Sequence, residues 1–219
     1  MRAAARDHAG LMDKVYRRQR FFYDATRKFY LFGRDRLISE LELRPSERLV
    51  EVGCGTARNL IKIARRYPGA ALFGLDASAE MLKTAARNIA RAGLESRIRL
   101  APGYAEALSP AQFGEEKPFD VALFSYSLSM IPDWKGALAA AEAALSPSGR
   151  IEIVDFGDLK GLPRTGEVLL RRWLTLFHVA PRSELLSSIE AQKPGAARLT
   201  LLPGRYAFLL RLQKQGLVR

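Results

Sequence analysis

The feature that most constrains this chain is a glycine turn, Glu51-Val52-Gly53-Cys54-Gly55-Thr56, between an apolar run and a helix-like stretch. The apolar residues up to Val52 are typical of a buried strand, and the two glycines let the backbone turn sharply and approach a ligand. Asp76 closes the next apolar run, where its carboxylate is placed to accept two ribose hydroxyls. This ordered set of strand, glycines, helix, strand and acid predicts a nucleotide-like ligand.

Two common phosphate-binding patterns are absent from this turn. The third glycine of a dinucleotide fingerprint would fall at Arg58, and the sequence has no Gly-Lys-Ser/Thr of a Walker-type loop. The remaining pattern resembles motif I of the S-adenosylmethionine (SAM)-dependent methyltransferases. The resemblance implies that the loop holds the methionine part of SAM, since this cofactor has no pyrophosphate. The alternative for a lone Gly-x-Gly is an ordinary strand-to-helix turn.

Composition favours one α/β domain without disulfide or metal chemistry. The 219 residues are 48% apolar, which is enough for one hydrophobic core. A single cysteine, Cys54, excludes a disulfide framework, and His8 and His178 are too few to suggest a metal cluster. We find no apolar stretch of membrane-spanning length and no signal-peptide pattern. We therefore expect a cytoplasmic chain that meets a membrane, if at all, only at its surface.

The positive charge of the chain is unevenly distributed. The net charge is +12, and residues 14–36 hold eight basic and two acidic residues, which gives +6 for this segment. Aromatic residues alternate with these basic residues, as in helices that lie at a lipid interface. The segment predicts contact with an anionic partner such as anionic lipids. The alternative is a helix that packs its aromatic face over the cofactor cleft.

Hydrophobic periodicity predicts a doubly wound, Rossmann-like α/β sheet that ends in an antiparallel hairpin. A helical lid (residues 1–44), broken near Gly33, is expected to precede a SAM-binding domain (residues 45–219). Ser78 is the expected N-cap of a helix. Strands are predicted at 48–52, 71–75, 98–101, 119–125, 149–154, 199–202 and 206–212, and helices at about 57–67, 78–92, 134–145 and 164–177.

The carboxyl ends of these strands define the expected cofactor site. Tyr104 stands where the resembled family usually has an aspartate that contacts adenine, so this tyrosine is predicted to stack on the base instead. Met81 is expected either as an apolar wall of the site or as a helix-core residue. The predicted cofactor-binding residues are Tyr23, Glu51, Gly53, Cys54, Gly55, Asn59, Asp76, Ala77, Ser78, Met81, Tyr104, Ala105, Glu106 and Ser125.

The acceptor is indicated by a second resemblance. The Asn/Asp-Pro-Pro-Tyr/Phe motif with which nucleobase methyltransferases hold a flipped base is absent after residues 119–125. Methylation of cytosine at C5 would need a nucleophilic cysteine after this strand, and Cys54 lies elsewhere. No nucleic-acid partner is therefore expected. Residues 16–20, 23–30, 33–36 and 125–134 resemble the betaine-lipid N-methyltransferases (the BtaB type), with Tyr23-Asp24-x-Thr26-Arg27-Lys28 most diagnostic. The resemblance implies trimethylation of diacylglyceryl-homoserine to diacylglyceryl-trimethylhomoserine by an enzyme peripherally associated with the inner face of the cytoplasmic membrane.

Methyl transfer from SAM to an amine requires positioning and desolvation of the reactants rather than a dedicated base, because water can accept the proton of the amine. The growing quaternary ammonium favours aromatic faces, and the substrate carboxylate favours arginine. His178 is expected to be a structural or cleft-rim residue rather than a base. Tyr16, Tyr23 and Tyr126 are therefore predicted as catalytic residues, and Arg20, Arg27, Tyr30, Tyr126 and Trp173 as substrate-binding residues. The alternative for each of them is a packing role.

Other functions remain open at this point. The nearest alternative acceptor is phosphatidylethanolamine, and a more distant one is a soluble amine or a quinol. An RNA methyltransferase, or a protein that binds RNA and SAM, would show strongly salt-dependent RNA affinity. A non-enzymatic interaction domain would not bind SAM.

Overall fold

The computed structural model describes residues 31–176, 179–190 and 197–214. The predicted lid before residue 31, including Tyr16, Arg20, Tyr23, Arg27 and Tyr30, therefore lies outside the described residues, as do His8 and His178. Within the described part, none of the helices is both long enough and apolar enough to span a bilayer.

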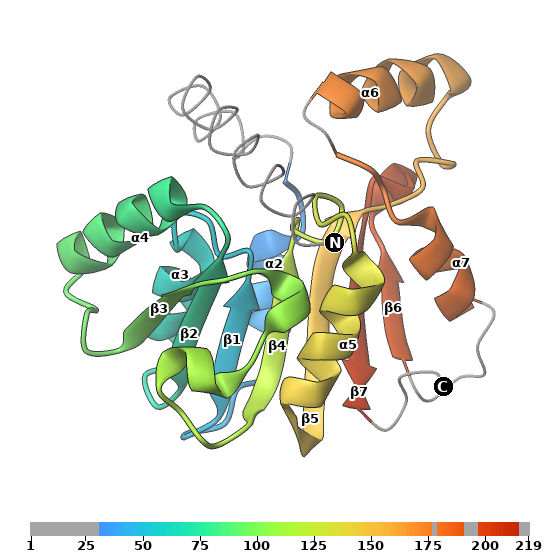
Figure 1. Ribbon diagram of the computed structural model, residues 1–219. Helices are drawn as coiled ribbons and strands as arrows, with labels where there is room; N and C mark the ends of the chain where they lie inside the picture. Colours follow the sequence, from blue (N-terminus) through green and yellow to red (C-terminus); the bar gives the residue numbers. More distant parts are fainter. Residues whose placement is uncertain (1–30, 177–178, 191–196, 215–219) are drawn as a thin grey trace.

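A seven-stranded mixed sheet forms the centre of the molecule, in the order β3-β2-β1-β4-β5-β7-β6 (Figure 1). The first five strands are parallel and β7 is antiparallel to both β5 and β6. Reversal of the strand order on either side of β1 creates the crevice where ligands of such sheets bind. The strands are β1 (Arg48–Val52), β2 (Ala71–Asp76), β3 (Ile98–Pro102), β4 (Phe119–Ser125), β5 (Leu145–Phe156), β6 (Ala197–Leu201) and β7 (Ala207–Gln213).

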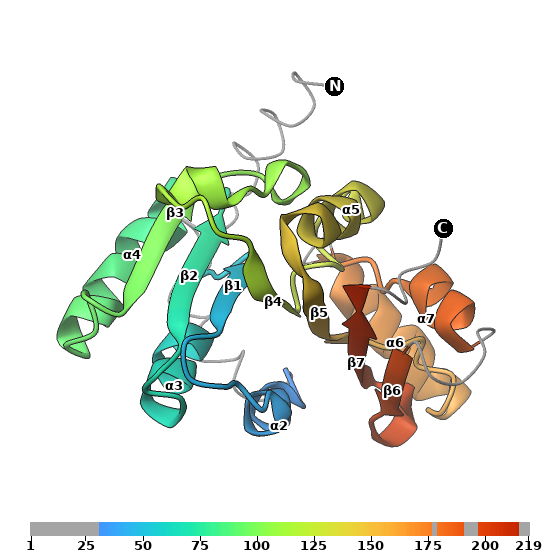
Figure 2. The ribbon, with the colours of Figure 1, turned by 90° about the horizontal axis from the view of Figure 1, so that it is seen from below.

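Helices cover both faces of the sheet (Figure 2). On one face α2 (Arg34–Glu40), α3 (Arg58–Arg66) and α4 (Ala79–Arg91) pack over a core cluster that includes Leu49 and Leu72. On the other face α5 (Trp134–Ala144) and α7 (Ser183–Glu190) pack over a cluster that includes Phe119 and Phe124. The last helix, α6 (Arg164–Leu176), stands beyond the end of β5 (Figure 1).

The doubly wound fold predicted from periodicity is confirmed, with differences at particular elements. The predicted bounds of β1 and β4 agree with the structure, and Ser78 caps α4 by accepting from the Met81 amide at 3.3 Å. Strand β5 starts at Leu145 instead of 149, because Leu145 pairs with Phe119 before a register shift. Helix α7 was not predicted; it is short, and it buries Leu185, Leu186 and Ile189.

The described part of the predicted lid, residues 31–43, belongs to the main core. Leu31, Leu37, Ile38, Leu41 and Leu43 are buried in the same cluster as the inner face of α3. Gly33 takes a positive φ of 86° and precedes α2, so a helix starts after this glycine, while the helix expected before it lies outside the described residues. The described residues of the predicted lid therefore pack with the main core, and the division of the chain at residues 44 and 45 stays a prediction.

Candidate functional site

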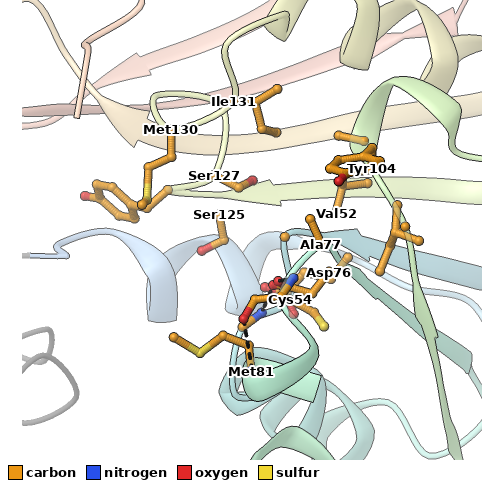
Figure 3. Close-up of a pocket in the computed structure, with 18 of the residues that line it drawn as sticks. Val52, Cys54, Asp76, Ala77, Met81, Tyr104, Ser125, Ser127, Met130 and Ile131 are labelled. Carbon is orange, nitrogen blue, oxygen red and sulfur yellow. Dashed lines mark hydrogen bonds between the residues drawn. The ribbon is translucent and has the colours of Figure 1, made fainter. Parts of the chain in front are cut away.

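A pocket opens at the carboxyl ends of β1, β2 and β4 (Figure 3). All predicted cofactor residues line it except Tyr23, which lies outside the described residues. Its opposite wall comes from the loop after β4, where Met130 and Ile131 lie across the cavity from Asp76 and Met81. The predicted lining residues are Glu51, Gly53, Cys54, Gly55, Asn59, Asp76, Ala77, Ser78, Met81, Tyr104, Ala105, Glu106 and Ser125.

The glycine turn forms the floor of this pocket. Gly53 and Gly55 have φ values of 75° and 54°, in the left-handed region that favours glycine. The amides of Gly53 and Cys54 both donate to the Leu75 carbonyl, at 2.8 and 3.0 Å, which ties the turn to the end of β2. A Cβ on Gly53 would lie 2.7 Å from the Cβ of Ser127, so a side chain there would collide with the opposite wall.

Asp76 connects the turn to the next helix. One carboxylate oxygen accepts from the Gly55 amide at 2.8 Å, and the other accepts from the Ser78 amide at 2.9 Å. These charge-assisted bonds hold the carboxylate at the pocket lining in one orientation. Each oxygen retains lone-pair capacity for a ligand hydroxyl, which agrees with the predicted ribose contact.

Glu51 and Asn59 form a buried polar pair below the turn. The two residues are only 2% and 7% exposed, and the Asn59 amide nitrogen donates to a Glu51 carboxylate oxygen at 2.7 Å. Arg58 donates to the side-chain oxygen of Asn59 at 3.2 Å and forms an ion pair with Asp35 at 3.1 Å. The arginine at the third glycine position therefore links α3 to α2 beside the pocket.

Buried contacts fix the opposite wall. The Asp155 carboxylate accepts from the Ser129 amide at 3.0 Å, and Arg182 donates to the carbonyls of Leu128 and Ile131 at 3.0 and 2.5 Å. Burial raises the pKa of Asp155 to about 6, although its hydrogen bonds with Ser129 act in the opposite direction. These contacts support the loop that carries Met130 into the pocket.

Tyr126 lines the pocket, and its prediction as a catalytic and substrate-binding residue, which rested on its aromatic face, stays a prediction. It is 3% exposed, and its hydroxyl donates to the Phe32 carbonyl at 2.6 Å. Burial, with the nearby Asp155 carboxylate, raises the pKa of Tyr126 far above its usual range, so the phenolate does not form. Its φ of 56° turns the chain out of β4 and aims the ring at Phe156, with 4.7 Å between ring centroids. Tyr126 thus positions the wall and the segment before α2.

Of two other predicted residues, Tyr104 lines the pocket and Trp173 does not. Tyr104 is 37% exposed and lines the pocket, as an adenine-stacking residue should. Trp173 lies on α6, packs partly buried against the main core and does not line the pocket, so its predicted substrate contact has no support in the structure. The buried thiol of Cys54 has a pKa well above its usual range because of burial and the nearby Asp76, which makes it unreactive.

Several lining residues were not predicted from the sequence. Arg34 reaches the pocket from α2, and Met130, Ile131 and Pro132 reach it from the loop after β4. From the sequence, Arg34 was interpreted only as part of the basic segment, and no periodic pattern indicates that its side chain points into the pocket. For the loop after β4, the available signal was the resemblance of residues 125–134 to the betaine-lipid N-methyltransferases.

The pocket fits the cofactor that motif I implies. The Oγ atoms of Ser125 and Ser127 line it, and both are buried without a hydrogen-bond partner among the described residues. Buried hydroxyls usually have a partner, so these two are available to a ligand. The glycine floor leaves room for close approach, and the Asp76 carboxylate is suited to ribose hydroxyls. The described residues contain no cluster of His, Cys, Asp and Glu that could hold a metal ion.

Comparisons with known proteins agree with this geometry. Residues 49–149 match the family described as Methyltransferase domain. The chain is 27% identical to the ubiquinone/menaquinone biosynthesis C-methyltransferase UbiE of Syntrophotalea carbinolica, over 96% of this chain and 85% of that protein. It is 34% identical to the nocamycin O-methyltransferase of Saccharothrix syringae, over 63% of this chain and 48% of that protein.

The crystal structure of the S-adenosylmethionine-dependent methyltransferase SibL superposes with a TM-score of 0.66 at 22% identity, over 89% of this chain and 58% of SibL. The chain thus spans about half of the O-methyltransferase and more than half of SibL, but most of the UbiE relative. Residues 49–149 thus match a methyltransferase domain, the fold is that of SAM-dependent methyltransferases, and S-adenosylmethionine is the cofactor of this pocket.

Proposed function

We propose that this protein is a SAM-dependent N-methyltransferase that trimethylates the amine of a lipid head group. The proposed substrate is diacylglyceryl-homoserine and the product is the betaine lipid diacylglyceryl-trimethylhomoserine. The resemblance of residues 16–36 and 125–134 to betaine-lipid N-methyltransferases supports this substrate. The methyltransferase domain and the cofactor pocket support the reaction class.

The observation that carries N-methylation is the chemistry of the wall opposite the glycine turn. Met130, Ile131 and Pro132 have no titratable group, and the hydroxyl of Tyr126 is already bound to a backbone carbonyl. Bound SAM supplies a methyl group that its sulfonium has already activated. An amine that has lost its proton to water needs only orientation and exclusion of water, which an apolar wall provides. Attack by carbon or by an unactivated hydroxyl would instead require a general base beside the acceptor.

The membrane part of the proposal rests on the basic segment, residues 14–36. At its described end, Asp35 pairs with Arg58 and Lys62, Arg36 pairs with Glu40, and Arg34 lines the cofactor pocket. The proposed attraction to anionic lipids therefore belongs to the basic residues before residue 31. We propose that these residues hold the enzyme at the inner face of the cytoplasmic membrane.

The UbiE likeness favours a second candidate, C-methylation in quinone biosynthesis, because it covers nearly the whole chain. Phosphatidylethanolamine is the alternative acceptor for N-methylation. The three candidates differ in the mass and head group of the lipid product.

Mass spectrometry of lipids extracted from a host that contains diacylglyceryl-homoserine and expresses the chain distinguishes them. The proposal expects mass gains of one, two and three methyl groups on that lipid. An Asp76→Asn variant, made to weaken cofactor binding, is the control and should give markedly less of these products. Methylated phosphatidylethanolamine alone, or a methylated quinone precursor alone, would overturn the proposed substrate.

A further inference from the structure

Helix α6 carries the most exposed apolar surface of the described chain. Leu169 and Val168 are 72% and 60% exposed, more than any other large apolar side chain among the described residues. Tyr104 and Phe32, the other two exposed examples, have explanations nearby: the first lines the pocket, and the second packs its ring on Tyr206 at 5.6 Å. The exposed pair on α6 has no such partner in the described structure.

The outward face of α6 is amphipathic and basic. At 3.6 residues per turn, Arg164, Thr165, Val168, Leu169 and Arg172 share one face, and all five are exposed. Neither Arg164 nor Arg172 makes an ion pair with a described residue, and this face contains no acidic residue. We call these five residues the α6 outer face. Two apolar side chains flanked by arginines are typical of helices that lie in a lipid interface.

The opposite face of α6 holds the helix to the body of the protein. Leu174 is 1% exposed, and Leu170 and Trp173 pack against the main core. Arg171 donates to the Asp158 carbonyl at 2.5 Å and pairs with Glu167 at 2.9 Å. Because the inner face is fully engaged, α6 presents its outer face as a fixed part of the fold.

The α6 outer face lies at the same end of the molecule as the cofactor pocket (Figure 1). Strand β5 runs parallel to β4 and ends at Phe156, and α6 begins eight residues later at Arg164. Figure 1 shows α6 beyond the carboxyl ends of the parallel strands, the end at which the cofactor pocket opens. A bilayer that contacts α6 would therefore lie at the end of the molecule where an acceptor enters.

We propose that the α6 outer face docks on an anionic lipid bilayer, with Val168 and Leu169 inserted among the lipids and Arg164 and Arg172 at the head groups. Charge complementarity and the absence of acids on this face favour a bilayer over a second copy of this basic chain. The inference deepens the proposed function and rests on it for the nature of the substrate. It adds a membrane contact separate from residues 14–36.

The test measures partitioning of the full chain into vesicles of phosphatidylcholine, with and without about 30% phosphatidylglycerol. Val168→Ser/Leu169→Ser should lower the partition coefficient about tenfold or more, because two apolar side chains no longer insert. Arg164→Gln/Arg172→Gln should lower it roughly tenfold on anionic vesicles only, and the difference should shrink at about 0.5 M salt.

The matched control is Arg87→Gln/Arg91→Gln, which removes the same charge from exposed positions on α4. It should leave partitioning within about twofold of the unchanged chain, because charge far from the docking face is screened. All variants should retain their thermal melting temperature and their affinity for SAM, since α6 does not line the pocket. Equal loss in the α4 control and the α6 variant would overturn the proposal.

A site-specific probe excludes other occupants of the face. The one native cysteine, Cys54, is buried, so a Leu169→Cys variant can be labelled selectively with an environment-sensitive dye. The proposal expects a blue shift of the dye emission only when anionic vesicles are added. A blue shift without lipid, or a dimer that the Val168→Ser/Leu169→Ser variant loses, would mean that protein covers this face and would overturn the inference.

The outcome is separable from that of the proposed function. If binding to vesicles depends on α6 but no betaine lipid forms, the docking face stands and the proposed substrate fails. If betaine lipid forms while the Val168→Ser/Leu169→Ser variant binds vesicles as well as the unchanged chain, the substrate stands and the docking face fails.

Discussion

The hydroxyl of Tyr126 donates a 2.6 Å hydrogen bond to the backbone carbonyl of Phe32, across 94 positions of the chain. Phe32 directly precedes Gly33, the N-cap of α2, and the first residue of that helix, Arg34, lines the cofactor pocket. The bond therefore joins the end of β4 to the segment that enters the site from the N-terminal side. One contact couples the wall of the pocket to the placement of Arg34.

Tyr126→Phe removes this hydrogen bond and leaves the ring packing unchanged. We expect the free energy of unfolding to fall by about 1 kcal/mol, the usual net contribution of one such bond. SAM affinity should fall modestly, because the segment that carries Arg34 is less well fixed. Urea unfolding and calorimetric titration measure the two effects. Tyr104→Phe is the control for stability, because the side chain of Tyr104 is 37% exposed. An unchanged unfolding free energy would show that the bond contributes nothing.

Asp76→Asn tests the link between the glycine turn and the cofactor. The amide replaces one acceptor oxygen by a donor, so either the Gly55 or the Ser78 amide loses its partner. We expect SAM to bind about tenfold more weakly or worse, since charge-assisted bonds contribute roughly 1.5–3 kcal/mol.

Asp120→Asn is the matched control for that change. Asp120 also accepts from a backbone amide, that of Arg48 at 2.9 Å, but at the start of β4, away from the pocket. This control should lose stability and keep its SAM affinity. Similar losses of affinity in both variants would argue against a specific role of Asp76.

Gly53→Ala and Gly93→Ala separate backbone strain from collision. Both glycines have a positive φ, 75° and 66°, but only Gly53 would place its Cβ in contact, 2.7 Å from the Cβ of Ser127. Gly93→Ala should lower the unfolding free energy by about 1 kcal/mol from strain alone. Gly53→Ala should cost roughly 1–3 kcal/mol more through overpacking and should also weaken SAM binding. Equal melting temperatures of the two variants would contradict the predicted collision.

The sequence predicts best where one local pattern determines the structure. Strand β1 and the turn after it follow from an apolar run closed by Gly53 and Gly55, whose freedom no other residue has. Their placement, and that of Asp76, needed no information from distant parts of the chain. The start of α2 directly after Gly33 follows for the same reason.

Distant contacts explain what the sequence could not predict. Tyr126 follows a buried strand, and an aromatic residue there suggested contact with the substrate. The structure keeps Tyr126 in the pocket lining but buries it and binds its hydroxyl to the carbonyl of Phe32, a partner that the local pattern does not indicate. The inward path of Met130 likewise depends on Asp155 and Arg182, which lie 25 and more residues further along the chain, and such pairings leave no periodic signal.

Asp155 provides a prediction about pH. Burial raises its pKa to about 6 in the folded chain, from a reference value of 3.8. The folded state therefore binds a proton more tightly than the unfolded state between these values. The stability that this proton provides is fully present below pH 3.8 and is lost as the pH rises through about 6.

Comparison with an Asp155→Asn variant isolates this effect, because other acids such as Asp35 and Asp158 have lowered pKa values and act in the opposite direction. From about pH 4 to about pH 7, we expect the unfolding free energy of the unchanged chain to fall by about 3 kcal/mol relative to the variant, since a tenfold difference in proton affinity corresponds to about 1.4 kcal/mol. Urea unfolding across this range measures the difference. The carboxylate also holds the Ser129 amide, so SAM affinity of the variant should depend less on pH than that of the unchanged chain. A constant difference in unfolding free energy would mean that Asp155 titrates alike in the folded and unfolded chains, and a rising one would reverse the predicted sign.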